Sequence, residues 1–424
     1  MLRIADIKED KEKVVNGLEK KRVANAAQQI DALLALDESR RSTQMESDTI
    51  LNELNTISKQ IGALMQKGDK AGAEHVKVQI GEMKLKSKAL QDRLKSIEEE
   101  LLQALYNLPN TAHEKVPAGT SSEDNLIVLE KGIIPDLLET ALPHWELIEK
   151  YDIIDFNLGN KISGAGFPVY KGKGAKIQRA LINFFLDEAA KAGFEEVQTP
   201  IVVNSDSGYG TGQLPDKEGQ MYGIVDSNLF LIPTAEVPIT NIYRDVIVKE
   251  EDLPIRNVGY TPCFRREAGS WGAHVRGLNR LHQFDKVEIV QITKPEDSYK
   301  ALEEMCAYVE SLLEKLELPF RKLLLCGGDM GFTSAMTYDM EVYSAAQKKW
   351  LEVSSVSNFE TYQANRLKLR YKEDGKKITI LHTLNGSALA LPRIVAAILE
   401  NNQKDEYISV PKVLQKYTGF DRID

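Results

Sequence analysis

The chain has 424 residues, of which 42% are hydrophobic and 28% are charged, a composition typical of a soluble globular enzyme with two or three domains. Its net charge of −9 argues against a protein that binds nucleic acid indiscriminately over its whole surface. The sequence has no signal peptide, no apolar run near the roughly 20 residues that span a membrane, no CxxC pair and no histidine spacing typical of zinc, so we expect a cytoplasmic protein without membrane attachment or zinc.

Residues 1–108 are predicted to form an N-terminal domain that contains a long antiparallel coiled-coil hairpin at about 28–107. From Val76 to Ala104, steps of four and three meet apolar residues at every position except Ser87, as in a helix that packs along a partner helix. The upstream stripe, which includes Leu51 and Leu54, is interrupted by polar residues such as Asp37. Glycines at 68 and 72 predict the turn of the hairpin, at about 65–73.

The distal half of this hairpin is basic within an acidic chain. Between Lys59 and Lys95 there are nine Lys or Arg residues and four Asp or Glu residues, a balance of +5. A solvated helix face is the simpler interpretation of such a run. A long arm with a basic end is also what an RNA-binding element requires, and the residues alone leave both interpretations open.

A linker is predicted at 109–125, followed by an α+β domain at 126–424. Apolar spacing predicts a helix that contains Ile177 to Phe185 and ends at Gly193. A strand is expected at 194–199, before Pro200, and the basic stretch Lys171–Gly174 is interpreted as a turn. Further elements are predicted in chain order, with strands at 258–265, 283–292 and 349–353 and a helix from about 389 to 401.

Phosphate binding in this domain has to rely on side chains. The sequence contains neither GxxxxGK[ST] nor a GxGxxG between a strand and a helix, so a P-loop and a dinucleotide fold are excluded. Arginine is suited to the task because its guanidinium group is planar, permanently charged and bidentate. Two segments contain candidate arginines, namely 263–288 with Arg265 and 384–393 with Arg393.

These segments resemble motifs of the seryl-tRNA synthetase family, a class II aminoacyl-tRNA synthetase family, in its bacterial type. Residues 263–288 resemble motif 2 in its seryl form, 193–200 resemble motif 1 and 384–393 resemble motif 3. Three further stretches, at 210–215, 233–238 and 325–331, match the family closely. The resemblance covers essentially the whole chain. It implies a catalytic domain built on a mainly antiparallel sheet with flanking helices, preceded by a coiled-coil arm.

The resemblance implies specific roles for residues that match the motifs. The implied serine pocket consists of Thr234, Ala235, Glu236, Arg265, Glu288, Asn385 and Ser387. The implied ATP site consists of Arg265, Arg266, Glu267, Arg280, Leu281, Phe284, Glu352, Val353, Ser354, Ser355 and Arg393, although strand alternation predicts that Arg266 points to the opposite face. Among these, Arg265, Glu267 and Arg393 are the implied catalytic residues, and Glu352 and Ser355 would hold Mg²⁺ with the ATP.

The resemblance also implies the partners. It predicts a homodimer that joins L-serine to serine tRNA, and also to selenocysteine tRNA where that tRNA is present. The predicted tRNA contacts are Lys59, Lys67, Lys70, Lys77, Lys84 and Lys88. Two alternatives stay open: a synthetase-like ligase that loads a carrier protein, and a coiled-coil RNA-binding scaffold with an inactive catalytic domain.

Overall fold

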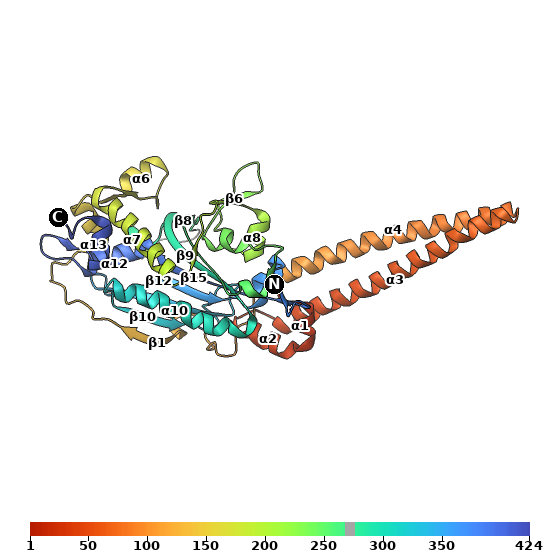
Figure 1. Cartoon of the computed structure of the whole chain (residues 1–424), viewed down its shortest axis with the longest axis horizontal. Coiled ribbons are helices and arrows are strands. Elements are labelled where there is room, and N and C mark those ends of the chain that lie inside the picture. Colours follow the sequence, from red (N-terminus) through yellow and green to blue (C-terminus); the bar gives the residue numbers. More distant parts are fainter. Residues whose placement is uncertain (268–275) are drawn as a thin grey trace. The chain divides into compact units, whose positions relative to one another are not determined.

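The computed structural model describes residues 1–267 and 276–424, and the chain divides into two compact units (Figure 1). The helical unit contains Leu2–Glu19 and Val23–Pro109. The catalytic unit contains Asn110–Asp424, together with Met1 and Lys20–Arg22. Within the two described ranges, every helix is too short or too polar to cross a membrane.

The helical unit begins with two short helices, α1 (Ile4–Glu9) and α2 (Lys11–Lys20). The long helices α3 (Ala26–Gln66) and α4 (Lys70–Asn107) then run antiparallel and side by side (Figure 1). Gly68 adopts a φ of +76° between them, and the Asp69 side chain accepts a hydrogen bond from the Gly72 N–H at 2.9 Å. The predicted coiled-coil hairpin is confirmed.

The contact between α3 and α4 follows the predicted apolar stripe on α4, where Ile80, Leu90 and Ile97 are buried. On α3, the prediction for Leu51 is wrong, because this residue is 38% exposed while the neighbouring Ile50 is buried. The polar interruption at Asp37 has a physical reason: its buried carboxylate lies 2.6 Å from Lys8 Nζ, 3.0 Å from Arg40 Nη2 and 3.1 Å from Arg41 Nε.

The catalytic unit is built on an eight-stranded sheet. Its strand order is β1-β10-β11-β12-β15-β9-β8-β4, and every neighbouring pair is antiparallel except β4 and β8. In that order, the strands span Leu126–Lys131, Phe320–Leu324, Met336–Ser344, Lys349–Asn358, His382–Ala390, Gln283–Thr293, Ile255–Phe264 and Glu195–Glu196. This arrangement confirms the predicted α+β class with a mainly antiparallel sheet.

Smaller sheets and helices surround the large sheet. The remaining strands are β2 (Ile154–Asp155), β3 (Val169–Tyr170), β5 (Val202–Asn204), β6 (Leu229–Leu231), β7 (Ile247–Lys249), β13 (Arg370–Glu373), β14 (Lys377–Ile380), β16 (Ile408–Ser409) and β17 (Arg422–Ile423). The helices are α5 (His144–Lys150), α6 (Phe156–Ile162), α7 (Gly172–Lys191), α8 (Ser205–Thr211), α9 (Glu236–Asn241), α10 (Ser298–Lys315), α11 (Thr361–Leu367), α12 (Leu391–Asn401) and α13 (Lys412–Thr418). Short 3₁₀ turns lie at Ser122–Asp124, Glu250–Asp252, Gly277–Asn279 and Pro295–Asp297.

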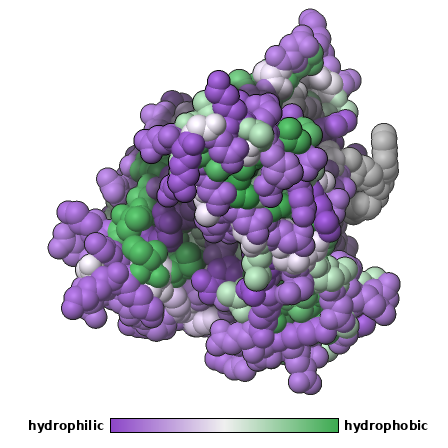
Figure 2. All heavy atoms as spheres, turned by 90° about the vertical axis from the view of Figure 1, so that its right-hand side faces the viewer, coloured by the Kyte–Doolittle hydropathy of each residue, from purple (hydrophilic) through white to green (hydrophobic). Residues whose placement is uncertain are grey.

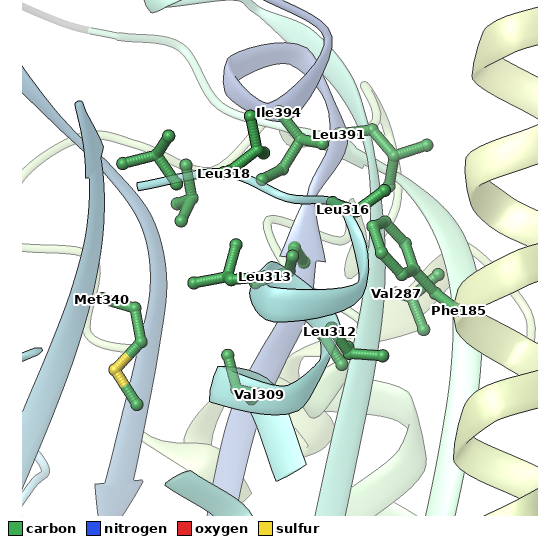
Figure 3. Packing of buried hydrophobic residues seen from close by; sticks show 14 of the residues in the cluster. Phe185, Val287, Val309, Leu312, Leu313, Leu316, Leu318, Met340, Leu391 and Ile394 are labelled. Atoms are coloured by element: carbon green, nitrogen blue, oxygen red, sulfur yellow. The ribbon is translucent and has the colours of Figure 1, made fainter. Parts of the chain in front are cut away.

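The main hydrophobic core lies between the large sheet and the helices α7, α10 and α12. Figure 3 shows Phe185 of α7, Leu312 of α10 and Leu391 of α12 around the strand residue Val287, and all four are buried. Side chains alternate between the two faces of a strand. Because Val287 and Ile289 of β9 face this core, Lys286 and Glu288 lie on the opposite face of the sheet.

Three local predictions differ from the structure. The strand expected at 194–199 is reduced to the two residues of β4, followed by one further hydrogen bond to β8 from the Val197 N–H to the Val258 carbonyl at 2.8 Å. The stretch Lys171–Gly174, interpreted as a turn, instead opens α7, whose buried face includes Ile177 and Phe185. The helix predicted from about residue 389 begins at Leu391, because β15 continues to Ala390.

The surface is mostly hydrophilic on the face that Figure 2 shows, where apolar side chains gather in smaller patches. One run of exposed apolar residues lies on the edge strand β1 and in the segment after it. This run consists of Leu126, Ile127, Val128, Ile133, Ile134 and Leu138, with exposed fractions from 45% to 90%. Exposed apolar side chains that gather along one segment can mark an interface with another protein.

Candidate functional site

Two adjoining cavities lie at the ends of the central strands of the large sheet. The first has a volume of about 170 Å³ and is lined by Arg265, Glu267, Leu278, Asn279, Arg280, Leu281, Phe284, Lys286, Glu352, Val353, Ser354, Ser387, Ala390, Pro392 and Arg393. The second has a volume of about 390 Å³ and is lined by Gly212, Gln213, Pro215, Asp216, Lys217, Glu218, Gln220, Met221, Pro233, Thr234, Arg265, Glu267, Arg280, Phe332, Thr333 and Arg393. Three arginines and Glu267 therefore line both cavities, which favours an elongated anionic ligand that contacts both.

Arg265 lies at the junction of the two cavities, immediately after β8. Its backbone N–H donates to the His282 carbonyl at 2.9 Å, which ties the end of β8 to the segment before β9. Its side-chain Nε donates to the Pro233 carbonyl at 3.3 Å, and its guanidinium carbon lies 5.3 Å from the centre of the Phe284 ring. These contacts leave terminal guanidinium nitrogens directed at the cavities, where they can bind a phosphate or a carboxylate.

The other charged residues of the first cavity form pairs around it. Glu267 has a φ of +48° where the chain leaves β8, and its carboxylate lies 3.2 Å from Arg280 Nε. Arg393, in the first turn of α12, donates from Nη1 to the Glu352 carbonyl at 2.7 Å, and the same nitrogen lies 3.6 Å from the Glu352 carboxylate. Two acidic residues thus hold two guanidinium groups at the wall of the cavity.

Glu288 lies deeper, on β9, directly opposite Gly259 of β8 and Ser387 of β15. It is 1% exposed, and its carboxylate lies 2.6 Å from Lys286 Nζ and 3.3 Å from the Thr234 hydroxyl. Lys286 also donates to that hydroxyl at 3.0 Å, and it lines the first cavity whereas Glu288 does not. Lys286 therefore contacts both the first cavity and the carboxylate of Glu288, a residue of the implied serine pocket.

Glu236 forms a second buried acidic position beside Glu288. Its carboxylate accepts a hydrogen bond from Gln363 Nε2 at 2.6 Å, and Thr383 donates to the Gln363 carbonyl oxygen at 2.7 Å. Burial, reinforced by the nearby charge of Glu288, raises the pKa of Glu236 to about 7 despite the hydrogen bond from Gln363. The charge of this pocket therefore changes close to neutral pH.

This pKa predicts a pH-dependent stability. Glu236 binds its proton more tightly in the folded chain, where its pKa is about 7, than in the unfolded chain, where its pKa is the ordinary 4.5. The bound proton therefore contributes fully to the free energy of unfolding below about pH 4.5, and this contribution is lost as the pH rises to about 7. Relative to the Glu236→Gln variant, the wild-type chain should lose stability across this window. The measurement is urea unfolding monitored by tryptophan fluorescence. The three tryptophans, Trp145, Trp271 and Trp350, all belong to the sequence of the catalytic unit, so the signal reports the unfolding of that unit. Parallel pH profiles for the two chains would contradict the prediction.

A set of oxygen donors lies beside the first cavity on β12. The Glu352 carboxylate is half exposed, and the Ser355 hydroxyl donates to the buried carboxyl of Asp339 on β11. Burial, followed by the charge of Glu352, raises the pKa of Asp339 well above its usual range. Carboxylate and hydroxyl oxygens are the ligands that Mg²⁺ prefers, so Glu352 and Ser355 could supply ligands to a magnesium ion, although the described residues contain no cluster of three or more His, Cys, Asp or Glu side chains placed to hold a metal.

Most of the other predicted site residues lie at or directly behind the cavities. Leu281, Val353, Ser354 and Ser387 line the first cavity, while the buried Ala235 lies between Thr234 and Glu236. Asn385 lines neither cavity, although it shares a strand face with Ser387. Arg266 is exposed outside both cavities, and its backbone N–H donates to the Gln220 carbonyl at 2.9 Å. Within the predicted motif 2, residues 268–275 lie outside the described residues.

Lys286, Gln363 and Asn279 are among the residues of the site that were not assigned from the sequence. Lys286 could have been found, because it lies two residues before Glu288 and thus on the same face of the predicted strand. Gln363 approaches the site from α11, beyond any recognised motif, so only the tertiary contact identifies it.

Comparisons with known proteins cover both units. Residues 1–112 match the family described as the seryl-tRNA synthetase N-terminal domain, and residues 222–402 match the tRNA synthetase class II core domain (G, H, P, S and T). The serine–tRNA ligase of Salinibacter ruber is 48% identical over 425 residues, covering 100% of this chain and 99% of the relative.

Solved structures show the same architecture. The crystal structure of seryl-tRNA synthetase from Pyrococcus horikoshii complexed with ATP has a TM-score of 0.91 and 33% identity, and the match covers 100% of this chain and 99% of that one. The cytoplasmic serine–tRNA ligase from Naegleria fowleri in complex with AMP has a TM-score of 0.85 and 26% identity, with 97% and 95% covered.

Proposed function

Because the chain belongs to the seryl-tRNA synthetase family, we propose that it activates L-serine with ATP and transfers the seryl group to the 3′ end of serine tRNA. In the first step, a serine carboxylate oxygen attacks the α-phosphorus of ATP, and pyrophosphate leaves. In the second step, a hydroxyl of the terminal tRNA nucleotide attacks the seryl carbonyl, and AMP leaves. The observation that carries the proposal is the convergence of Arg265, Glu267, Arg280 and Arg393 on two adjoining cavities.

Arg265 would bind the reacting groups. Its position at the junction of the cavities allows it to contact the α-phosphate and the serine carboxylate, which are the two anions that approach each other in the first step. A fixed guanidinium group stabilises the charge that develops on the phosphoryl oxygens. Glu267 would accept from the adenine amino group, while Phe284 and Arg393 enclose the purine and Arg393 and Arg280 reach toward the outer phosphates.

Serine would be bound behind this position. Glu288 and Glu236 supply negative charge for the ammonium group, and the hydroxyl groups of Thr234 and Ser387 supply hydrogen-bonding partners. Lys286 pairs with Glu288 and lines the cavity, so the serine ammonium has to compete with it for the carboxylate or displace it. Buried polar groups dedicated to a substrate hydroxyl are left unpaired by alanine, which accounts for selectivity without proofreading.

Magnesium would be held at Glu352 and Ser355, where the oxygen donors and the raised pKa of Asp339 fit a divalent cation. When bound, the ion would neutralise phosphate charge. The chain's own contribution is to hold Glu352 beside Arg393, so that an acidic and a basic group lie next to the phosphate chain.

The second cavity would receive the 3′ end of the tRNA. It adjoins the first through Arg265 and is rimmed by the polar residues Gln213, Lys217 and Gln220. The basic distal half of the α3–α4 hairpin would contact the body of the tRNA, since Lys59, Lys67, Lys70, Lys77, Lys84 and Lys88 are all exposed. Binding by shape and phosphate contacts suits a long helical arm better than base-specific readout.

Replacing Lys67, Lys70 and Lys77 by alanine is expected to raise the KM for tRNA about tenfold at moderate salt, because each lost phosphate contact lowers the salt-dependent affinity. Serine-dependent exchange of pyrophosphate into ATP should not change, since that reaction does not involve tRNA. The measurement is aminoacylation at several salt concentrations. The matched control replaces the exposed Lys372, Lys376 and Lys377 of the β13–β14 hairpin. An unchanged KM for tRNA in the arm variant would refute the predicted contact.

A homodimer would bury the exposed apolar run on β1 and the segment after it, which includes Ile127 and Ile133. Sedimentation of the free protein measures this assembly directly.

The cytoplasm, where tRNA is charged for translation, is the proposed location.

The decisive test of function is pyrophosphate exchange with each of the amino acids, followed by charging of serine tRNA and selenocysteine tRNA. We expect exchange that depends on serine and charging of serine tRNA. Serine-dependent exchange without charging of any tRNA would favour a ligase for a carrier protein. Absence of exchange with every amino acid would favour an inactive scaffold.

A further inference from the structure

A buried histidine–carboxylate pair lies behind the first cavity, outside the roles proposed above. His144 begins α5 and Glu400 lies in the last turn of α12, and both are 0% exposed. The Glu400 carboxylate accepts from His144 Nδ1 at 2.6 Å and from the His144 backbone N–H at 2.9 Å. It also accepts from Gln347 Nε2 at 2.7 Å and from the Ser344 hydroxyl. Burial alone would raise the pKa of Glu400, but the hydrogen bonds from His144 and Ser344 outweigh burial and lower it.

The second nitrogen of His144 contacts the wall of the cavity. The Leu278 backbone N–H lies 2.8 Å from His144 Nε2. Because a backbone N–H can only donate, Nε2 must be the acceptor, and the ring proton therefore lies on Nδ1, where it donates to Glu400. One neutral tautomer of His144 thus satisfies both contacts.

The residue before Leu278 has to be glycine for this contact to form. Gly277 has a φ of +66°, and a Cβ atom at this position would lie 2.3 Å from His144 Nε2. The left-handed conformation and the close approach of the ring both exclude a larger side chain. The close approach indicates that the chain at 276–280 is fitted to the imidazole ring.

The segment that His144 fixes leads directly to the nucleotide side of the site. Leu278, Asn279 and Arg280 line the first cavity. The Asn279 carbonyl accepts from Arg393 Nε at 3.1 Å, and its side-chain amide donates to Gln347 at 3.2 Å. Since Gln347 also binds Glu400, one connected network joins the buried pair to the guanidinium of Arg393.

We propose that His144 and Glu400 are positioning residues for ATP, which hold the 278–280 wall and orient Arg393 through the Asn279 carbonyl. The inference rests on the proposed assignment of the first cavity to the nucleotide. Neither side chain lines that cavity, so any effect on ATP must pass through the wall. The pair should therefore affect ATP more than serine, whose proposed pocket contains neither residue.

Two substitutions of His144 separate its contacts. Glutamine can place an acceptor near Nε2 and keep the bond to Leu278, whereas asparagine can reach only the Nδ1 position and loses that bond. We expect His144→Asn to weaken ATP binding, measured by calorimetry with Mg·ATP and no serine, by about tenfold, because a buried N–H is left without an acceptor. His144→Gln should stay within about threefold of wild type, and the KM for serine should not change in either variant. The matched control is His382→Gln, a histidine that is 9% exposed and bonded to Ser298 at 2.8 Å.

Unchanged ATP affinity in His144→Asn would overturn the proposal, as would equal losses in the asparagine, glutamine and control variants. If the asparagine variant fails to fold, the proposal is tested with Glu400→Gln, which should weaken ATP binding in the same way. Its control is Glu310→Gln on α10, because Glu310 is also a buried carboxylate in an ion pair, 9% exposed and 2.8 Å from Lys322 Nζ. Loss of folding in both tested positions would assign the pair to stability alone and also overturn the proposal. If the wild-type chain binds ATP but shows no serine-dependent exchange, the proposed function is refuted, whereas the positioning role of His144 and Glu400 for ATP still holds.

Discussion

Replacing Arg265 by alanine is expected to lower serine-dependent pyrophosphate exchange by roughly 10³-fold, the scale of losing one charged group that stabilises a transition state. The expected change is mainly in kcat, because the charge that Arg265 would stabilise develops as the carboxylate and the α-phosphate react. The measurement is steady-state exchange with ATP and serine varied separately. Lysine at this position should recover only part of the rate, since an ammonium group lacks the planar fork that binds two oxygens at once.

The matched control is Arg256→Ala. Arg256 lies near the start of β8, the same strand that ends next to Arg265, and its guanidinium lies 3.3 Å from Glu304 on α10, away from both cavities. This control should retain wild-type exchange. Wild-type exchange in Arg265→Ala would refute the proposed site as a whole, because Arg265 lines both cavities and contacts both Phe284 on β9 and the Pro233 carbonyl.

Replacing Glu288 by glutamine is expected to raise the KM for serine by about 100-fold, while the KM for ATP changes little. The substitution keeps the shape of the side chain but removes the charge that would pair with the serine ammonium, and hydrogen bonds to charged groups contribute about 1.5–3 kcal/mol. The substitution also removes the ion-pair partner of Lys286, which then has Glu236 as its nearby carboxylate. Part of the loss in serine affinity will therefore come from a rearranged pocket.

The control for this prediction is Glu188→Gln. Glu188 on α7 is 9% exposed and lies 2.6 Å from Lys191 Nζ, so it shares the burial and the ion pair of Glu288 without lining a cavity. Its loss should lower stability but leave both KM values unchanged. Equal rises in the KM for serine and for ATP in Glu288→Gln would contradict the assignment, because a specific ammonium partner affects one substrate.

The sequence was most informative where a local pattern is sufficient to determine the secondary structure. The stripe from Val76 to Ala104 and the glycines at 68 and 72 predicted the antiparallel hairpin, because a helix pair follows from periodicity and a turn from residues that tolerate a positive φ. The ordered motifs around Arg265 and Arg393 identified the family and the class of fold. The register of α3 was missed at Leu51 because two adjacent apolar residues, Ile50 and Leu51, fit the pattern equally well.

The tertiary structure decided which side chains meet. Strand alternation places Lys286 and Glu288 on one face of the sheet, but their contacts with Thr234 depend on the packing of the segment after β6, where the Phe264 N–H donates to the Ile232 carbonyl at 2.8 Å. The link from His144 to Leu278 spans 134 residues, and that from Gln363 to Glu236 spans 127, so neither follows from local spacing. Periodicity and motifs report the environment of a residue along its own element, whereas buried polar contacts depend on the packing of elements distant in the sequence, where each buried polar group must find a partner.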